Sequence, residues 1–241
     1  MNDNREKERL EREAENARIN FSANVTHQLK TPLHAISGYS ELIANGMATG
    51  DDARKFGFRI YMEAQRTLDM VNDILALSKL DDSAEMFNDE EIDFCSFICS
   101  IVTSFKTMAE MKGVLLELKT SEPDEEKIIM HVSSKLIRGM TESLVDNAIK
   151  YTGSGGSVNV YAGWSENSRP VLVVKDTGIG IPQDEQENVF QRFYRVEKSA
   201  SSKTGGTGLG LTIVKQSAKR LGAEIQMKST PGEGTEIKIL F

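Results

Sequence analysis

The chain has 241 residues, of which 39% are hydrophobic, and it carries a formal net charge of −7. This size suits one large domain or two small ones with buried cores, and the acidic balance, without a run of Lys or Arg, argues against a nucleic-acid-binding protein. No apolar run approaches the roughly 20 residues of a membrane span, and the polar start "MNDNREKERLEREAENARIN" is unlike a signal peptide. We therefore expect a soluble cytoplasmic piece, and its abrupt helical start suggests that another segment precedes it.

Two long helices are predicted in the first third of the chain. Residues 1 to about 45 predict one helix, because apolar side chains recur three or four apart from Ile19 to Ile43. The stretch "NGMATGDD" supplies turn residues around Gly46 and Gly50. A second helix is expected from about residue 51 to 80, with an apolar stripe formed by Ile60, Ala64, Leu68, Val71, Leu75 and Leu77.

These two helices predict an antiparallel hairpin with an apolar stripe on each helix. A single hairpin cannot cover both stripes, so we expect two chains to pair into a four-helix bundle. The polar segment "KLDDSAEMFNDEE" then predicts a linker.

After the linker the pattern changes to alternating helices and strands. Helices are predicted at 93–113, 133–152 and 206–222, and strands at 114–119, 127–132, 157–164, 169–176, 223–229 and 235–241. This order predicts an α/β sandwich in which one mixed sheet lies under a layer of helices. Cys95 and Cys99, four residues apart in an apolar helix, predict two buried thiols rather than a disulfide or a metal site.

His27 lies in the first helix, in the stretch "NVTHQLKTPLHAISGY". At about 100° per residue its side chain points away from Val25 and Leu29 and therefore towards water. His34 lies roughly 10 Å along the axis, too far for the two histidines to bind one metal ion. An exposed histidine is often only a surface residue, but its imidazole can also act as a nucleophile towards a phosphoryl group.

A proline follows this histidine closely. Pro32 has no N–H group, so the carbonyl of Gln28 lacks its helical partner and the helix can bend just past His27.

Two glycine-rich segments in the second half predict a phosphate-binding site. "DTGIG" at 176–180 follows a strand, and "GGTGLGL" at 205–211 opens a helix. Glycine lets backbone amides approach phosphate closely, and a helix N-terminus adds a favourable field. Neither segment matches a Walker loop or a Rossmann fingerprint.

These segments carry a resemblance to a known family. "FSANVTHQLKTPLHAISGYSELI" resembles the phosphoacceptor box of sensor histidine kinases, and "ESLVDNAIKYT", "DTGIGIP", "VFQRFYR" and "GTGLGLTIVK" resemble the N, G1, F and G2 boxes of their ATP-binding domain, in that order. The resemblance runs from about Phe21 to Phe241. It implies a signalling helix at 1–20, a dimerisation and phosphotransfer domain at 21–82, a linker at 83–89 and a Bergerat-type ATP-binding domain at 90–241.

The resemblance assigns the principal site residues. It implies that His27 is phosphorylated, that Asn147 holds Mg²⁺ against the ATP phosphates and that Asp176 accepts a hydrogen bond from the adenine amino group. An amide oxygen is a suitable ligand for a hard cation. The alternative for Asp176 is a turn aspartate before glycine.

Further ATP contacts are implied around these residues. Lys150 and Tyr151 match residues that touch phosphate or ribose, although Tyr151 could equally be half-buried packing. Arg192 matches a γ-phosphate ligand, with a solvated arginine as the alternative, and the segment from about 183 to 204 resembles a mobile lid anchored by Phe190 and Phe193. The remaining implied ATP-binding residues are Gly178, Gly180, Gly206, Thr207, Gly208, Leu209 and Gly210.

The sequence departs from the family pattern at two positions. Gln28 stands where Glu or Asp usually follows the histidine; an amide oxygen accepts a hydrogen bond but takes no proton, and loss of a general base typically costs roughly 10²–10⁴ in rate. The amide is either an engineered replacement or natural to this homologue. Thr31 matches the residue that positions water for dephosphorylating a partner, and this activity could survive the replacement by Gln28. Ser143 replaces a second N-box Asn, and Glu142 lies roughly 100° around the helix from the position of the catalytic Glu of related ATPases.

The resemblance implies an autokinase that uses Mg-ATP to phosphorylate His27 and then transfers the phosphoryl group to an aspartate of a response-regulator receiver domain. It also implies a homodimer, attached to a membrane only through a sensor region upstream. Two alternatives stay open: a kinase-impaired module that binds or dephosphorylates the regulator, and a Bergerat-fold ATPase. Ser143 argues against the ATPase, because it cannot activate water as a carboxylate would.

Overall fold

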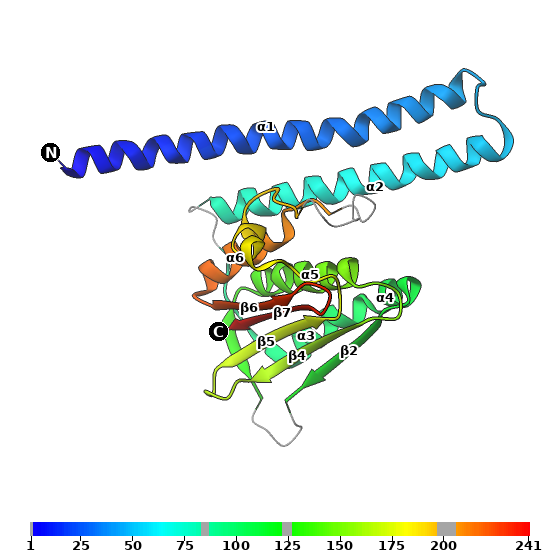
Figure 1. The fold of residues 1–241 in the computed structure, drawn as a ribbon. Helices are drawn as coiled ribbons and strands as arrows, with labels where there is room; N and C mark the ends of the chain where they lie inside the picture. Colours follow the sequence, from blue (N-terminus) through cyan, green and yellow to red (C-terminus); the bar gives the residue numbers. More distant parts are fainter. Residues whose placement is uncertain (1, 83–86, 122–126, 197–205) are drawn as a thin grey trace. The chain divides into compact units, whose positions relative to one another are not determined.

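The computed structural model describes residues 2–82, 87–121, 127–196 and 206–241, with side chains from Phe21 onward. The chain forms two compact units, Met1–Asn72 and Asp73–Phe241, and Figure 1 traces both from blue to red. None of the helices in these described ranges is long and apolar enough to cross a membrane.

The first unit is the predicted helical hairpin. Helix α1 (Asn2–Ala44) continues through Pro32, and α2 (Gly50–Asp81) begins after a turn at which Gly46 and Gly50 have positive φ angles. Near this turn the rings of Tyr39 and Phe56 stack at 5.2 Å, and the guanidinium of Arg59 donates to the Tyr39 hydroxyl at 3.1 Å. These contacts join the two helices and confirm the predicted hairpin.

The apolar stripe of α2 divides between the two units. Its side chains in the first unit include Leu68, which is 56% exposed in the single chain. Leu77, predicted to belong to the bundle stripe, is instead fully buried beside Leu80, Leu136 and Leu209 of the second unit. That part of the prediction is wrong, because the last turns of α2 pack with the second unit and not with the hairpin.

The second unit contains a mixed sheet, as predicted, and this sheet has five strands. Its strands run in the order β2-β4-β5-β7-β6, and only the β2–β4 pair is parallel. The helix between these two strands in the chain provides the crossover that a parallel pair requires. The elements are β1 (Glu90–Asp93), α3 (Phe94–Ser104), α4 (Lys106–Lys112), β2 (Leu115–Thr120), β3 (Ile129–Val132), α5 (Ser134–Tyr151), β4 (Ser157–Trp164), β5 (Pro170–Asp176), η1 (Gln183–Glu185), η2 (Asn188–Phe190), α6 (Gly210–Leu221), β6 (Glu224–Thr230) and β7 (Gly234–Leu240).

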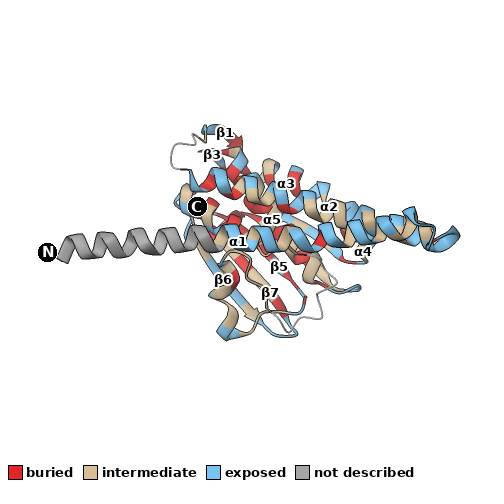
Figure 2. Ribbon diagram, turned by 90° about the horizontal axis from the view of Figure 1, so that it is seen from above, coloured by how far each residue is buried: buried red, intermediate tan, exposed pale blue. Residues whose placement is uncertain are grey.

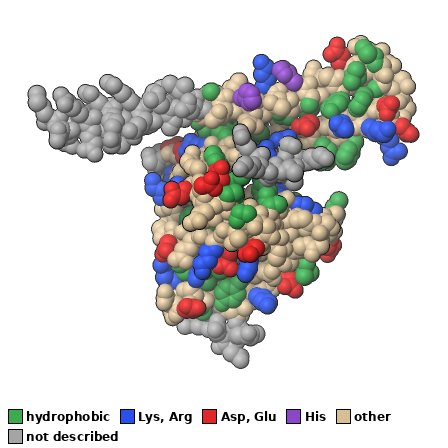
Figure 3. Space-filling model, in the orientation of Figure 1, with side chains coloured by type: hydrophobic (Ala, Val, Ile, Leu, Met, Phe, Trp, Pro, Cys, Tyr) green, Lys and Arg blue, Asp and Glu red, His purple; other side chains and the backbone are tan. Residues whose placement is uncertain are grey.

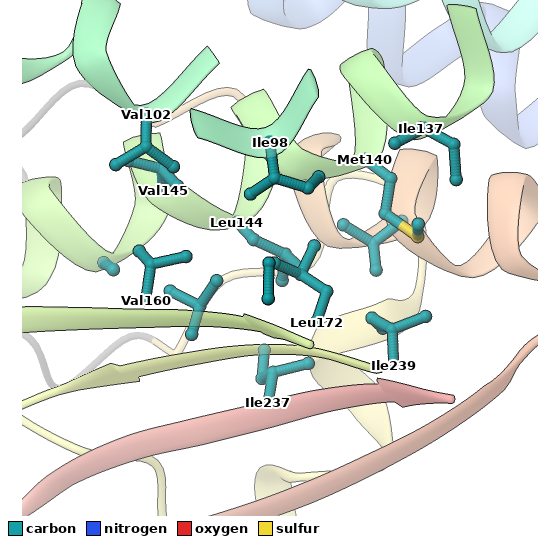
Figure 4. Packing of buried hydrophobic residues seen from close by; sticks show 14 of the residues in the cluster. Ile98, Val102, Ile137, Met140, Leu144, Val145, Val160, Leu172, Ile237 and Ile239 are labelled. Carbon is teal, nitrogen blue, oxygen red and sulfur yellow. The ribbon is translucent and has the colours of Figure 1, made fainter. Parts of the chain in front are cut away.

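The larger of the two buried clusters among the described residues of the second unit is an apolar layer between the helices and the sheet. Figure 4 shows Ile98 and Val102 of α3 facing the same space as Leu172 of β5 and Ile239 of β7. These four side chains are at most 1% exposed, and they belong to one cluster with residues of α5. Most of the buried residues lie in this unit (Figure 2). Its packed sheet and helices therefore hold the ends of the loops at the sheet edge in fixed positions.

Two predicted elements differ in detail. The helix predicted at 93–113 is interrupted at Phe105, whose ψ of −6° leaves the helical range and whose N–H bonds back to the Val102 carbonyl at 3.1 Å. The strand predicted at 127–132 does not join the main sheet: β3 pairs antiparallel with β1, a strand that was not predicted.

The two cysteines are less buried than predicted. Cys95 is half-buried and its thiol donates to the Ala162 carbonyl at 3.4 Å, whereas Cys99 is exposed. Both are free thiols, as expected. Helix α3 packs through Phe94, Ile98 and Val102, so Cys99 falls outside its buried face.

Candidate active site

Asp176 lies at the end of β5 and is only 8% exposed. Its Oδ1 accepts hydrogen bonds from the N–H groups of Gly178 at 2.8 Å and Thr235 at 3.2 Å. Burial raises the pKa of this carboxyl, and the two backbone hydrogen bonds oppose that rise. None of the described residues donates to Oδ2. The buried carboxylate therefore keeps one oxygen for another donor.

Glycines pack closely around this carboxylate. A Cβ on Gly178 would lie 2.5 Å from the Tyr151 carbonyl oxygen, and one on Gly180, where φ is +66°, would lie 2.0 Å from the Thr230 carbonyl oxygen. Any larger side chain at these two positions would push the loop away from its neighbours. The sequence "DTGIG" is thus explained by backbone packing beside Asp176.

Helix α5 brings the next set of residues to the start of α6. The amide nitrogen of Asn147 lies 3.1 Å from the position of a Cβ on Gly210, and the Tyr151 hydroxyl lies 2.9 Å from that of a Cβ on Gly206. Asn147 and Tyr151 therefore border the glycine segment at 206–210. The ammonium of Lys150 pairs with Asp146 at 2.6 Å, one turn earlier on the same helix.

The second glycine segment packs against the F-box region. Phe193 donates its N–H to the Gly208 carbonyl at 2.9 Å, and its φ of +62° is unusual for a bulky residue. Gly208 has a φ of +72°, and a Cβ there would lie 2.9 Å from the carbonyl carbon of Phe193. Phe193 thus packs against the glycine segment, whereas its role as an anchor of the lid stays a prediction, and residues 197–204 of the expected lid lie outside the described residues.

Three of the implied ATP ligands contact other parts of the protein. The Thr207 hydroxyl donates to Asp73 at 2.7 Å, and the Leu209 side chain is fully buried. Arg192 donates to both carboxylate oxygens of Asp81, at 2.6 and 2.8 Å. The two aspartates belong to the last turns of α2, and nothing in the sequence pattern had marked them as partners of these residues.

The N-box position four residues before Asn147 is Ser143, which has no carboxylate to activate water. Ser143 is half-buried, and Glu142 pairs instead with Arg138 at 3.6 Å on the same helix. Within the described ranges, no three His, Cys, Asp or Glu side chains gather as a metal site.

The histidine of the hairpin lies where the sequence predicted it. His27 is exposed while Val25 and Leu29 are half-buried, and histidine side chains are visible on the hairpin surface in Figure 3. The Thr31 hydroxyl donates to the His27 carbonyl at 3.3 Å, so it lies one turn away on the same helix. Gln28 is half-buried.

Two family models match this chain in the same order as its two units. Residues 17–83 match "His Kinase A (phospho-acceptor) domain", and residues 133–241 match "Histidine kinase-, DNA gyrase B-, and HSP90-like ATPase". The sensor histidine kinase WalK of Bacillus subtilis is 36% identical over 234 residues, which is 96% of this chain. The chain belongs to the sensor histidine kinase family. It spans 37% of the length of WalK, so this family member corresponds to only part of its relative.

Solved histidine kinases share the fold. The kinase ThkA, crystallised in complex with the response regulator TrrA, superposes with a TM-score of 0.76 at 20% identity, over 98% of this chain and 65% of that chain. The kinase ShkA, crystallised in complex with AMPPNP, gives a TM-score of 0.64 at 24% identity, over 90% of this chain and 44% of that chain. At these identities the similarity establishes the fold: a helical hairpin followed by a histidine-kinase-type ATP-binding domain.

Proposed function

We propose that this chain is the autokinase core of a sensor histidine kinase, which uses Mg-ATP to phosphorylate His27 and then phosphorylates an aspartate of a response-regulator receiver domain. The observation that carries the proposal is Asp176: a buried carboxylate with one oxygen satisfied by backbone N–H groups and the other left for a ligand. Oδ2 is not among the buried side-chain atoms that lack a partner, which are Arg66 Nε and Ser133 Oγ in the described part of the chain. A donor from outside the protein can therefore reach this oxygen, while Oδ1 stays fixed by the backbone.

Asp176 would recognise the adenine ring. Its unsatisfied Oδ2 accepts a hydrogen bond from an exocyclic amino group, whereas guanine presents a carbonyl at the same position and would leave two acceptors facing each other. The glycines at 178 and 180 let the loop pack closely against the Tyr151 and Thr230 carbonyls, which would leave room beside Asp176 for a flat base. This arrangement supports ATP rather than GTP as the substrate.

The N-terminus of α6 would hold the phosphate groups. Backbone N–H groups at 206–210 and the helix field both favour anions there. Asn147, whose amide lies beside Gly210, is the candidate Mg²⁺ ligand through its side-chain oxygen. Lys150 and Tyr151, at the C-terminal end of α5, would contact phosphate or ribose, Lys150 after leaving Asp146 and Arg192 after leaving Asp81.

His27 would be the acceptor of the phosphoryl group. One of its ring nitrogens donates a lone pair to form the N–P bond, and the electrons of the broken P–O bond leave with ADP. When bound, Mg-ATP supplies the γ-phosphoryl group and the charge neutralisation of its transfer. Gln28 can hold the other ring N–H through its amide oxygen but cannot remove that proton. We therefore infer a slow autokinase, with a kinase-impaired regulator-binding or phosphatase module as the limiting case.

The partners follow from the first unit. The match to a His Kinase A domain and the exposed apolar side chains of α2, such as Leu68 at 56%, support pairing of two chains into a four-helix bundle. ThkA was crystallised with a response regulator, which supports a receiver domain as the second partner here. Attachment to a membrane would depend on parts of a longer protein.

Mass spectrometry under neutral conditions tests the proposal. After incubation with Mg-ATP, the chain and its Gln28→Glu variant are both digested and searched for phosphohistidine. We expect phosphate on His27, with up to about 10²-fold faster labelling in the variant because a carboxylate restores the general base. His34→Ala is the matched control, and it should still be phosphorylated on His27. The absence of modified His27 in the Gln28→Glu variant contradicts the proposal, whereas steady phosphate release without labelling indicates an ATPase.

A further inference from the structure

The C-terminus of α5 is held by a lysine from another helix. Lys112, the last residue of α4, donates through Nζ to the carbonyls of Ile149 at 2.7 Å and Lys150 at 2.5 Å. Carbonyls in the last turn of a helix have no N–H partner within that helix, and a cation at this end also interacts favourably with the helix dipole. One ammonium group therefore satisfies two acceptors that α5 cannot satisfy itself.

The ammonium of Lys112 is partly withdrawn from water to make this contact. Burial lowers the pKa of Lys112, and the nearby Lys150 acts in the same direction, whereas the carboxylate of Asp146 opposes both. Asp146 also pairs with Lys150 at 2.6 Å. The three charged groups thus form one cluster at the end of α5, and its only negative member interacts with both lysines.

The turn that Lys112 holds carries residues of the proposed nucleotide site. The Tyr151 carbonyl, next to the two that Lys112 binds, accepts the N–H of Ile179 at 3.3 Å. The same oxygen would lie 2.5 Å from a Cβ on Gly178. The loop that follows Asp176 therefore rests directly on the end of α5, and a shift of that helix end would move the loop with it.

We propose that Lys112 is a positioning residue for nucleotide binding: it fixes the last turn of α5 and thereby aligns Asn147, Tyr151 and the loop at 176–180. This inference rests on the proposed function, because it concerns the same ATP site. Lys112 acts through backbone carbonyls and not through contact with the nucleotide. Its role thus differs from the one proposed for Lys150, whose side chain would contact the phosphate or ribose directly.

The test compares nucleotide affinity in three variants of the whole chain. Lys112→Met removes the charge and the donors but keeps the apolar stem. Lys112→Arg keeps the charge and the donors. Lys106→Met is the matched control, because Lys106 is exposed on the same helix and has no ion pair with any described residue. Affinity for a non-hydrolysable ATP analogue is measured by calorimetry at a temperature at which all variants have the same circular dichroism.

We expect the dissociation constant to rise about tenfold in Lys112→Met, which corresponds to the loss of a hydrogen bond from a charged donor. It should return close to the parent value in Lys112→Arg and stay unchanged in Lys106→Met. Hydrogen exchange adds a readout that overall stability does not move: the Ile179 amide should exchange faster in Lys112→Met while the amides of β7 keep their rates.

Each outcome decides between the two proposals. If the parent binds the analogue and Lys112→Met binds it equally well, the positioning role is wrong and the proposed function stands. If the parent does not bind the analogue, both are wrong. Should Lys112→Met fail to fold, the same comparison is made with Lys112→Gln, whose amide keeps a donor at the end of a shorter stem.

Discussion

Arg192 donates through one nitrogen to both carboxylate oxygens of Asp81, at 2.6 and 2.8 Å. The arginine that we propose as a nucleotide ligand is therefore held by the end of α2, where Arg220 also binds the Leu80 carbonyl at 2.9 Å. A guanidinium held by a carboxylate is less available to a phosphate. If Arg192 binds the nucleotide as proposed, this ion pair competes with that binding.

Removing the Asp81 charge should release Arg192. In Asp81→Asn we expect autophosphorylation to rise about two- to fivefold, since partly exposed ion pairs are typically worth up to about 1 kcal/mol. The initial rate of labelling at subsaturating ATP measures the effect. Asp89→Asn, an exposed aspartate outside the pair, is the control. A slower Asp81→Asn variant would show that the aspartate orients the arginine for the nucleotide instead of withholding it.

Affinity for ATP should depend on the ionisation of Asp176. Because burial raises the pKa of this carboxyl, it takes up a proton at a higher pH than an ordinary aspartate. The protonated form is a poor acceptor, so affinity should be complete above the pKa of Asp176 in the free protein and should fall as the pH drops through it.

The effect on folding has the opposite sign. Burial disfavours the ionised Asp176 in the folded state, so its charge costs stability above the folded pKa, and that cost disappears in acid. Weaker binding in acid therefore cannot come from unfolding driven by this group. In Asp176→Asn, affinity at neutral pH should be about 10- to 100-fold lower and this part of the pH dependence should vanish. An unchanged pH profile in that variant would contradict the assignment.

Two leucines close together near the C-terminal end of α2 differ sharply in burial. Leu77 is fully buried, whereas Leu75 is 55% exposed in the single chain. We expect Leu77→Ala to lower the free energy of unfolding of the second unit by about 2–5 kcal/mol, as for other buried leucines. Leu75→Ala should leave that unit unchanged and weaken pairing of two chains. Thermal unfolding measures the first effect and sedimentation the second. A Leu77→Ala variant with unchanged stability and weakened pairing would show that Leu77 belongs to the four-helix bundle.

Thr31 should matter for the partner's phosphate and not for the chain's own phosphorylation. Its hydroxyl donates to the His27 carbonyl at 3.3 Å, and that of Thr26 donates to the Ser22 carbonyl at 2.9 Å in the same way. In Thr31→Ala, dephosphorylation of a phosphorylated receiver domain should slow by roughly tenfold or more, while labelling of His27 persists. Thr26→Ala is the matched control. Equal loss in both variants would indicate a general effect on the helix.

Local patterns predicted much of this fold because the energetic preferences they reflect are local. The 3.6-residue period gave the limits of α1 and α2, and Gly113 ended α4 as a left-handed C-cap should. The break at Phe105 escaped prediction because it depends on how that ring packs against the core. The pairing of β3 with β1 also depends on contacts far apart in the sequence.

In the candidate site, too, features set by local residue types could be predicted, whereas contacts between distant residues could not. Asp176 and its glycines stand out in the sequence, because close backbone packing demands particular residue types. Asp73, Asp81 and Lys112 do not, because their partners lie 134, 111 and 37 or 38 positions away in the chain. A charged residue on a helix surface looks the same in the sequence whether it faces water or holds a distant carbonyl.

The position of β7 in the sheet has a consequence for synthesis. This strand, Gly234–Leu240, bonds to both β5 and β6, yet it is the last of the described elements to leave the ribosome. Until then a nascent chain exposes the unpaired edges of β5 and β6 and the apolar side chains that Ile237 and Ile239 will cover. The sheet of this unit can therefore close only after Gly234–Leu240 has left the ribosome, and a chain stalled before that point would bind chaperones through the exposed edges and apolar side chains.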